Sequence, residues 1–329
     1  MAYLSYGLVW DMAPLPVQPI AWYRCRLSAC YGEAVLRIGL LTPAVYRPPA
    51  QSNLWENDCS VDDLVSIVQT ADALGFDHLT CSDHTAIPVT TAAGRGSTYW
   101  DPAATLAFIA ARTRWIKLAT HVLVLGYRHP LQLVKQFSTV DRLSNGRVIL
   151  GLGVGSLRAE FELLGAEFEN RGSVADDAVQ AIRASWGERV AAYHGDYFDF
   201  ADMLVEPTAV QRRVPLWFGG STARSLRRAI NLGDGWVPFG LDAPSLAAML
   251  KRWELPERFD VVLEAVRLDA VADAARVEDT VHGLFELGAT VVNVAFTHNS
   301  LAECIDQMTA VAELLDMGRS TVDQAGWEA

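Results

Sequence analysis

Short apolar runs alternate with longer amphipathic segments from residue 36 almost to the end of the chain. The apolar runs have the length of buried strands, and the segments between them have the helical period. The expected strands are Leu36–Leu41, Phe76–Cys81, Ile116–Val124, Val148–Leu152, Val214–Phe218, Gly235–Phe239, Phe259–Leu268 and Thr290–Phe296. The expected helices are Val61–Leu74, Ala103–Arg112, Leu131–Leu143, Glu160–Leu164, Asp176–Trp186, Ala223–Leu232, Leu246–Trp253, Val277–Leu287 and Leu301–Leu315.

Residues at the ends of several segments support the helices. Ser60 stands at the N-cap position of the first one, and Gly75 follows its end as a C′ residue. Asp101-Pro102 combines an aspartate cap with proline at the first helical position. Two segments break the alternation: a polar loop over Thr85–Trp100, and a weak hairpin pattern over Val190–Phe200.

Eight strand candidates, most of them followed by a helix, predict the fold class. Alternating strands and helices imply parallel pairing, and eight such units close a barrel. We therefore expect an α/β fold, a (β/α)8 TIM barrel with insertion segments, in preference to an open doubly wound sheet. The barrel is expected over 35–318 and a short tail over 319–329. Residues 1–34 are expected to be a poorly ordered extension; the alternative is an arm that packs on the barrel or on a partner.

Composition excludes several functions. The 329 residues are 51% apolar and carry a net charge of −12, which argues against binding nucleic acid or an anionic membrane. No apolar run reaches the ~18 residues of a spanning helix, and the N-terminus lacks the pattern of a secretory signal. The five cysteines are odd in number and irregularly spaced, which favours reduced thiols and a cytoplasmic location.

In a barrel of this type, chemistry is expected on the loops that follow the strands. After the second strand, Asp83 precedes His84, whose imidazole can exchange a proton near neutral pH. Adjacent side chains on a strand point to opposite faces, so Asp83 need not touch His84. A histidine that only hydrogen-bonds loop backbone is an equally good interpretation of this position.

Glycine-rich turns follow two other strands. Gly219-Gly220-Ser221-Thr222 leads into a helix, whose free N–H groups and dipole suit a phosphate; an ordinary strand-to-helix turn is the alternative. Gly151, Gly153 and Gly155 permit close backbone approach by a flat ligand, or else tight packing. Neither turn matches a Walker or Rossmann motif. Patterns for a metal site or for a hydrolase nucleophile are also missing, so no metal is predicted.

Several short motifs in this order resemble the bacterial luciferase-like monooxygenase superfamily, and within it the branch of oxidoreductases that use the deazaflavin coenzyme F420. The residues that carry the resemblance are Phe76–Leu79, Ser82–His84, Thr120–Val122, Tyr127–Pro130, Asp141–Arg147, Gly151–Gly155, Pro215–Gly220 and Leu232–Trp236. The match is specific to the superfamily and less specific to the branch.

The resemblance implies a flavin-type ring at the C-terminal mouth of the barrel, and a homodimer. It implies a non-proline cis peptide at His121-Val122, forming a bulge that backs the ring. It places His84 as the catalytic histidine, and Gly220 and Ser221 at the coenzyme phosphate. The predicted cofactor-binding residues are Asp83, Thr120, His121, Val122, Gly153, Val154, Gly155, Gly219, Gly220 and Ser221.

Two departures from the branch concern the substrate. Its sugar-phosphate dehydrogenases carry a tryptophan shortly after the histidine, where this chain has Pro88, and an acidic residue after the glycine run, where it has Ser156. Sugar-phosphate oxidation is therefore not expected. The substrate pocket is expected to form from Thr85–Trp100, Phe168–Arg171 and Val190–Phe200.

The resulting prediction is an enzyme that transfers a hydride between coenzyme F420 and a small organic substrate. The first alternative is a monooxygenase that uses reduced FMN supplied by a partner reductase. The second is a non-catalytic relative that binds flavin, because the tryptophan and the acidic residue are replaced.

Overall fold

The computed structural model describes residues 36–49 and 51–317; the predicted extension and tail lie outside them. Nine parallel segments make one closed sheet. They are β1 (Ile38–Leu40), β2 (His78–Cys81), β3 (Lys117–Thr120), β4 (Leu123–Val124), β5 (Val148–Gly153), β8 (Leu216–Gly219), β9 (Gly235–Val237), β10 (Asp260–Leu268) and β11 (Val291–Phe296). β1 pairs with both β2 and β11, and β5 pairs with both β3 and β8. This closure confirms the (β/α)8 barrel and excludes an open sheet.

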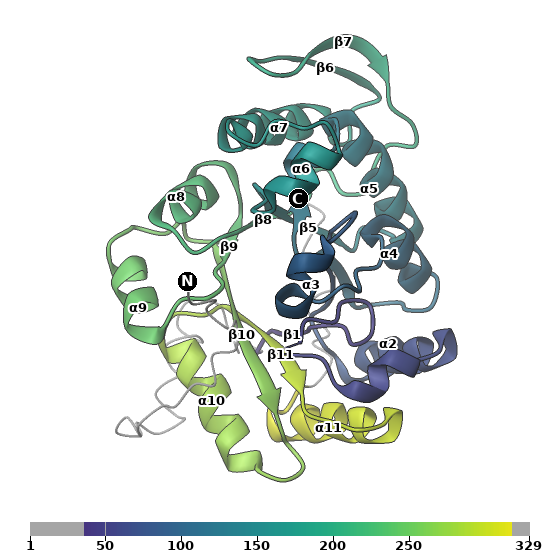
Figure 1. The fold of residues 1–329 in the computed structure, drawn as a ribbon, viewed down its shortest axis with the longest axis vertical. Coiled ribbons are helices and arrows are strands. Elements are labelled where there is room, and N and C mark those ends of the chain that lie inside the picture. Colours follow the sequence, from purple (N-terminus) through teal and green to yellow (C-terminus); the bar gives the residue numbers. More distant parts are fainter. Residues whose placement is uncertain (1–35, 50, 318–329) are drawn as a thin grey trace.

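Helices surround the strands (Figure 1). The long ones are α2 (Val61–Leu74), α4 (Pro102–Ala110), α5 (Pro130–Ser144), α7 (Arg171–Ser185), α8 (Ala223–Leu232), α9 (Ala243–Lys251), α10 (Ala274–Glu286) and α11 (Leu301–Leu314). The short ones are η1 (Leu54–Asp58), α3 (Val89–Arg95), η2 (Leu125–Tyr127) and α6 (Arg158–Leu163). The predicted caps are present: Ser60 accepts a hydrogen bond from Asp63 N, Asp101 accepts one from Ala104 N, and Gly75 has φ 85°.

Beyond small shifts at the ends of several elements, the structure differs from the predicted elements in four places. The expected strand over Ile116–Val124 is divided into β3 and β4, because the chain bulges at residues 121 and 122. The loop expected over Thr85–Trp100 contains α3. Helix α7 begins at Arg171 instead of Asp176. The hairpin is present but longer than predicted, with strands β6 (Val190–His194) and β7 (Asp199–Leu204), and it projects beyond α7 (Figure 1).

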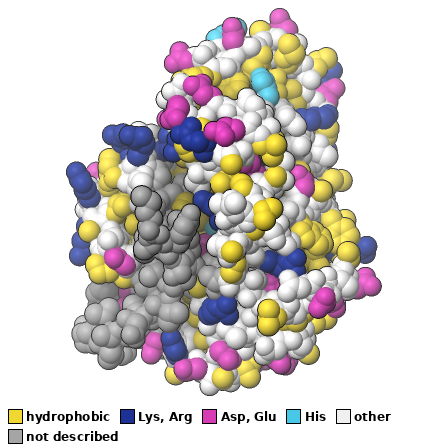
Figure 2. All heavy atoms as spheres, viewed as in Figure 1, with side chains coloured by type: hydrophobic (Ala, Val, Ile, Leu, Met, Phe, Trp, Pro, Cys, Tyr) yellow, Lys and Arg dark blue, Asp and Glu magenta, His cyan; other side chains and the backbone are white. Residues whose placement is uncertain are grey.

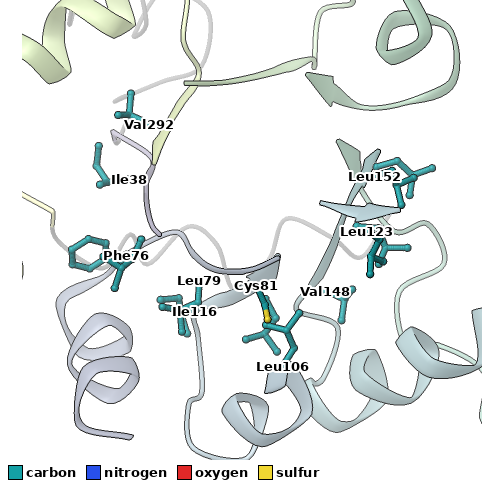
Figure 3. Packing of buried hydrophobic residues seen from close by; sticks show 14 of the residues in the cluster. Ile38, Phe76, Leu79, Cys81, Leu106, Ile116, Leu123, Val148, Leu152 and Val292 are labelled. Carbon is teal, nitrogen blue, oxygen red and sulfur yellow. The ribbon is translucent and has the colours of Figure 1, made fainter. Parts of the chain in front are cut away.

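Two apolar layers hold the barrel. The larger lies between the strands and the helices, and includes Ile38, Phe76, Leu106 and Leu152 (Figure 3). The smaller fills the barrel interior and consists of Ala119, Ile149, Trp217, Val237, Val262 and Val291. Trp217 and Trp236 are among the largest fully buried side chains and belong to the core. No helix in the described part of the chain is long and apolar enough to cross a membrane.

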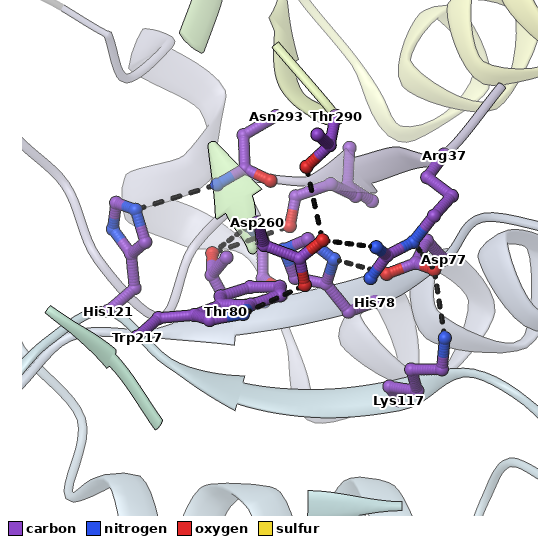
Figure 4. Close-up of polar contacts among 12 residues, drawn as sticks. Arg37, Asp77, His78, Thr80, Lys117, His121, Trp217, Asp260, Thr290 and Asn293 are labelled. Carbon is purple, nitrogen blue, oxygen red and sulfur yellow. Dashed lines mark hydrogen bonds and ion pairs between the residues drawn. The ribbon is translucent and has the colours of Figure 1, made fainter. Parts of the chain in front are cut away.

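Ion pairs close the N-terminal end of the barrel (Figure 4). Arg37 donates to Asp77 at 3.0 Å and to Asp260 at 2.6 Å, and Lys117 donates to Asp77 at 3.0 Å. Burial alone would raise the pKa of Asp77, but the two cations outweigh it and hold that pKa well below its usual range. The cluster thus joins the first residues of β3 and β10 to the residues that directly precede β1 and β2.

Arg147 connects the start of β5 to the segment that precedes β3. It lies just before β5 and donates to the backbone oxygens of Ala110, Thr113, Ile116 and Ser144 and to the hydroxyl of Thr113. Ala110 and Ser144 are the last residues of α4 and α5, so their carbonyls have no helical partners of their own; Thr113 and Ile116 lie in the segment between α4 and β3. The planar guanidinium can serve several of them at once.

We expect Arg147→Ala to lower the free energy of unfolding by about 3 kcal/mol, because several partly buried carbonyls lose their donor. The matched control is Arg142→Ala, whose exposed guanidinium donates to Thr208 alone among the described residues. Its cost should stay below about 1 kcal/mol. Urea unfolding of both variants measures the difference, and equal losses would contradict the role assigned to Arg147.

Candidate active site

The predicted site residues follow the C-terminal ends of neighbouring strands. His84 lies after β2, His121 and Val122 lie between β3 and β4, Gly153 ends β5, and Gly219 ends β8. Because all these strands are parallel, the four segments meet at one end of the barrel, the mouth. The structure therefore brings the predicted residues to one face of the fold.

A buried carboxylate holds His84. Glu160, on α6, places Oε2 2.6 Å from His84 Nδ1, and its own side chain has no exposed surface. The His84 side chain is 15% exposed. Its Nε2 has no hydrogen-bond partner in the described part of the chain, so this nitrogen is available to a ligand. A carboxylate on one ring nitrogen fixes the orientation of an imidazole and sets which nitrogen carries the proton.

Glu160 also binds the backbone beyond His84. Its Oε1 accepts hydrogen bonds from Thr85 N and Ala86 N, and its Oε2 accepts one from Tyr127 Oη at 2.7 Å. Burial alone would raise the pKa of Glu160, but the bonds from His84 and Tyr127 outweigh it and lower that pKa. Burial and the contact with Glu160 raise the pKa of Tyr127. The site thus holds an ionised carboxylate and a neutral phenol.

Glu160 was not among the residues predicted from the sequence. The position at which the related sugar-phosphate dehydrogenases carry an acidic residue is Ser156 here, directly after the glycine run. Glu160 instead lies in the following short helix and points back at His84. The signal in the sequence was a glutamate inside a segment already expected to be helical. Tyr99 was also missed; its ring packs edge-on against His84 at 4.5 Å between centroids.

Asp83 and His84 have separate partners, as the strand geometry predicted. Asp83 accepts hydrogen bonds from both Nη atoms of Arg128, at 2.6 and 2.8 Å, and one from Val124 N at 3.1 Å. Its carboxylate is therefore engaged in holding β4 and the turn after it. Cofactor binding by Asp83 stays a prediction; in this structure the residue positions the bulge.

The bulge is where it was expected. The His121-Val122 peptide bond is cis, which confirms the prediction. His121 N donates to Cys81 O, and His121 O accepts from Ser82 Oγ, both at 2.8 Å. Thr120 Oγ1 donates to Gly151 O at 2.8 Å. The bulge is thus hydrogen-bonded to β5 through Thr120 and to the end of β2 through His121.

The bulge packs directly against glycines of β5 and β8, where a larger residue would collide with it. A Cβ on Gly151 would lie 2.0 Å from Thr120 O, and one on Gly153 would lie 2.7 Å from Val122 Cγ2. One on Gly219 would lie 3.2 Å from Val122 Cγ1. The space beside these glycines is therefore filled by the protein itself. A direct approach of ligand to Gly153, Val154 and Gly155 stays a prediction.

The turn after β8 has open polar groups. Gly220 has φ 134° and its N–H donates to Val237 O, while Thr222 caps α8 through Ser225 N. The hydroxyl of Ser221 has no hydrogen-bond partner among the described residues. Arg224 and Arg227 of α8 are exposed, and basic side chains gather over this part of the surface (Figure 2). Helix start and cations together favour an anion here.

The inner wall of the mouth carries a second titratable pair. His121 Nε2 lies 3.3 Å from Glu264 Oε1, and Asn293 Nδ2 lies 3.5 Å from the same nitrogen (Figure 4 shows the contact with Asn293). Burial raises the pKa of Glu264 to about 7. Burial, with the nearby His78, lowers the pKa of His121 to about 4. Near neutral pH this imidazole is uncharged, and Glu264 is divided between its two forms.

The segments predicted to form the substrate pocket differ in their contacts. Residues 85–100 lie at the site, where Tyr99 touches His84 and Arg95 donates to Ser156 Oγ at 3.2 Å. Arg171 donates to Gly155 O at 3.1 Å. The hairpin packs Phe198 and Phe200 against His129, beside the turn after β4.

A cavity of about 560 Å³ lies away from these residues. It is lined by the C-terminal parts of α7 and α8 and by the residues just before β8, among them Arg183, Arg212 and Arg213. Within the residues that the structure describes, no group of three His, Cys, Asp or Glu side chains is placed to hold a metal ion.

Comparison with known proteins gives a family and several relatives. A family model described as luciferase-like monooxygenase matches residues 36–313. An uncharacterised protein of Mycobacterium tuberculosis (strain ATCC 25618 / H37Rv) is 29% identical over 68% of this chain and 83% of its own length. An F420-dependent glucose-6-phosphate dehydrogenase of Amycolatopsis mediterranei is 30% identical over 53% of this chain and 52% of its own. An FMNH2-dependent dimethylsulfone monooxygenase of Pseudomonas putida is 26% identical over 39% of this chain and 36% of its own length.

Solved structures share the fold. A monooxygenase, RslO1, from Streptomyces bottropensis matches with a TM-score of 0.66 and 21% identity, over 85% of this chain and 98% of that one. A coenzyme F420-dependent tetrahydromethanopterin reductase from Methanopyrus kandleri matches with a TM-score of 0.61 and 15% identity, over the same shares. At these identities the likeness concerns the fold alone.

Glu264 should make stability depend on pH. Its folded pKa of about 7 lies above the unfolded value of about 4.3, so the fold prefers the protonated form. Its contribution is complete below pH ~4 and is lost as the pH rises through ~7. Glutamine mimics the neutral acid. As the pH rises from 5 to 8, the free energy of unfolding of Glu264→Gln should therefore increase by roughly 2–3 kcal/mol relative to that of the parent. Denaturant unfolding across this range measures the gain.

The matched control is Glu313→Gln, at an exposed position of α11. Its stability should follow the parent at every pH. A constant difference between Glu264→Gln and the parent from pH 5 to 8 would contradict the raised pKa of Glu264.

Proposed function

The chain belongs to the luciferase-like monooxygenase family, and we propose that it is an oxidoreductase that transfers a hydride between coenzyme F420 and a small organic substrate. The observation that carries the proposal is the 2.6 Å contact between His84 Nδ1 and Glu160 Oε2 at the barrel mouth. It gives His84 the position of a proton donor or acceptor whose Nε2 is free for a ligand.

The dyad would move the proton that accompanies the hydride. With Nδ1–H donated to Glu160, the neutral ring presents the lone pair of Nε2 and can accept a proton from a substrate hydroxyl. The resulting imidazolium lies against the ionised Glu160, which stabilises it. In the opposite direction the same group donates the proton to a carbonyl oxygen. Tyr127 holds the carboxylate from the other side and keeps it in place.

The mouth has features that fit a ring with a phosphate-bearing side chain. Val122 presents an apolar side chain seated on glycines of β5 and β8, which suits a flat ring. The turn Gly219–Ser221 and the start of α8 offer N–H groups, a free hydroxyl and nearby arginines to a phosphate. When bound, a deazaflavin supplies a carbon centre that accepts or delivers a hydride. The barrel contributes binding, orientation and exclusion of water.

An FMNH2-dependent monooxygenase is the second candidate, supported by the Pseudomonas putida relative. It would use the same mouth and would need a partner reductase. We favour F420 because the dehydrogenase named for it matches a longer part of this chain at higher identity. The dyad also argues against a relative without chemistry. A homodimer and a cytoplasmic location are part of the proposal.

A titration with each coenzyme tests the choice of cofactor. We expect F420 to bind the purified protein at micromolar concentration, with a change in its fluorescence, and FMN to bind far more weakly. Tight binding of FMN together with oxygen consumption in the presence of FMNH2 would support the monooxygenase instead. Binding of neither coenzyme would contradict both functions.

Variants of the dyad test the role of His84. We expect His84→Ala to lower turnover with F420 by about 10²-fold or more while coenzyme affinity changes little, because a general acid–base is lost. Glu160→Gln should also lower turnover, and should shift the pH profile, because the imidazolium loses its counter-ion. His282→Ala, on α10 and outside every segment assigned to the site, is the matched control. Unchanged turnover in His84→Ala would refute the role.

A further inference from the structure

A polar row crosses the inner wall of the barrel, from the mouth toward its N-terminal end. Val262 of β10 and Val291 of β11 belong to the apolar layer inside the barrel. Glu264 and Asn293 lie two residues further along the same strands, so their side chains also point inward. The pairing register places Glu264 beside Asn293, and Asn293 beside Gly39 of β1. The row continues to His78 of β2, whose ring reaches the space over Gly39.

This row contains buried polar atoms without partners. In the described residues, Asn293 Oδ1 and His78 Nε2 make no hydrogen bond. A Cβ on Gly39 would lie 2.3 Å from the first atom and 2.5 Å from the second, so both converge on the space that the glycine leaves. Buried polar groups normally have a partner, and orphaned ones indicate a missing water or ligand group. The inner wall is thus a polar site with unused hydrogen-bonding capacity.

Glu264 faces this site with little to balance its charge. Its only ion-pair partner among the described residues is His121, at 3.3 Å, and burial keeps that imidazole neutral near pH 7. Tyr46, from the segment after β1, also faces the carboxyl and is held neutral by burial. His78, beyond Asn293, pairs with Asp77. About a fifth of the Glu264 side chain and 13% of the His121 side chain remain accessible.

We propose that Glu264 and His121 form a second proton-exchange site at the mouth, and that binding of the coenzyme there is accompanied by uptake of a proton at Glu264. The inference rests on the proposed function for the identity of the ligand. A ligand that displaces water from the mouth makes the charged carboxylate less favourable, and a ligand that brings negative charge does so further. The protonated carboxyl donates its hydrogen to His121 Nε2, so the pair becomes a neutral hydrogen bond.

The site is distinct from the dyad in position and in charge. His84 is held by Glu160 in the loop after β2, whereas Glu264 lies on β10, across β1 and β11. Glu160 has four donors and stays ionised; Glu264 has one neutral partner and gains a proton. The first site exchanges a proton with the substrate. The second takes up a proton at Glu264 when the coenzyme binds, which removes one negative charge from the mouth.

Calorimetry of coenzyme binding tests the proposal. The protein is titrated with F420, and with FMN, at pH 8 in two buffers that differ in ionisation enthalpy. For the parent protein we expect the buffer dependence to correspond to uptake of nearly one proton. In Glu264→Gln the uptake should disappear, and in the control Glu313→Gln it should match the parent.

The pH dependence of affinity gives a second measure. The dissociation constant of the parent should rise by up to about tenfold per pH unit above pH ~7, because binding takes up a proton and the proton concentration of the solution falls tenfold per unit. Glu264→Gln should bind with the affinity of the parent at low pH and should lack this rise. Equal proton uptake in the parent and in Glu264→Gln would overturn the proposal.

A measurement on the unaltered protein keeps the test independent of the variant's folding. An infrared difference spectrum on coenzyme binding at pH 8 should gain the band of a protonated carboxyl group, and its absence would overturn the proposal. Failure of the proposed function gives a different result, since the parent would then bind neither coenzyme at any pH. Binding without proton uptake overturns only the role of Glu264.

Discussion

The mouth of this barrel depends on the buried carboxylate of Glu160. It accepts hydrogen bonds from the imidazole of His84, the phenol of Tyr127 and two backbone N–H groups of the loop after β2. These donors come from segments that follow different strands, so one side chain fixes their relative positions. A buried carboxylate is costly unless its oxygens are satisfied, and here the donors that satisfy them are those that define the site. Loss of any one donor would leave part of this buried carboxylate unsatisfied.

The bulge between β3 and β4 depends in the same way on its neighbours. Val122 packs against Gly153 and Gly219, and Thr120 O lies against Gly151. The glycines of β5 and β8 thus leave the space that the bulge occupies. Asp83 holds the far side of the bulge through Val124 N and Arg128. Packing against the bulge therefore explains why these positions are glycine, without reference to any ligand. The surface offered to a ring is the outer side of Val122, which these contacts hold rigidly.

The architecture could be predicted from the sequence because alternation, caps and strand count all point to one fold. Glu160 could not, since its role requires α6 to turn back over the mouth, and no local pattern encodes that orientation. The glutamate was visible only as one residue of an expected helix. Similarly, Asp83 and His84 are adjacent in sequence, but their partners, Arg128 and Glu160, are distant in it. The cis bond was expected from a family resemblance and not from any physical signal in the residues.

Two carboxylates at one mouth with opposite environments are the central electrostatic feature of the site. Glu160 is held ionised by its donors, whereas Glu264 is raised toward neutrality because burial meets no compensating charge. A single change of pH or of ligand therefore affects them differently: it leaves Glu160 as the counter-ion of His84 and changes the state of Glu264. Under the proposed function the mouth accepts occupants of different charge, and such a division suits it. One carboxylate keeps the imidazole of His84 oriented, while the other is proposed to exchange a proton with the surroundings.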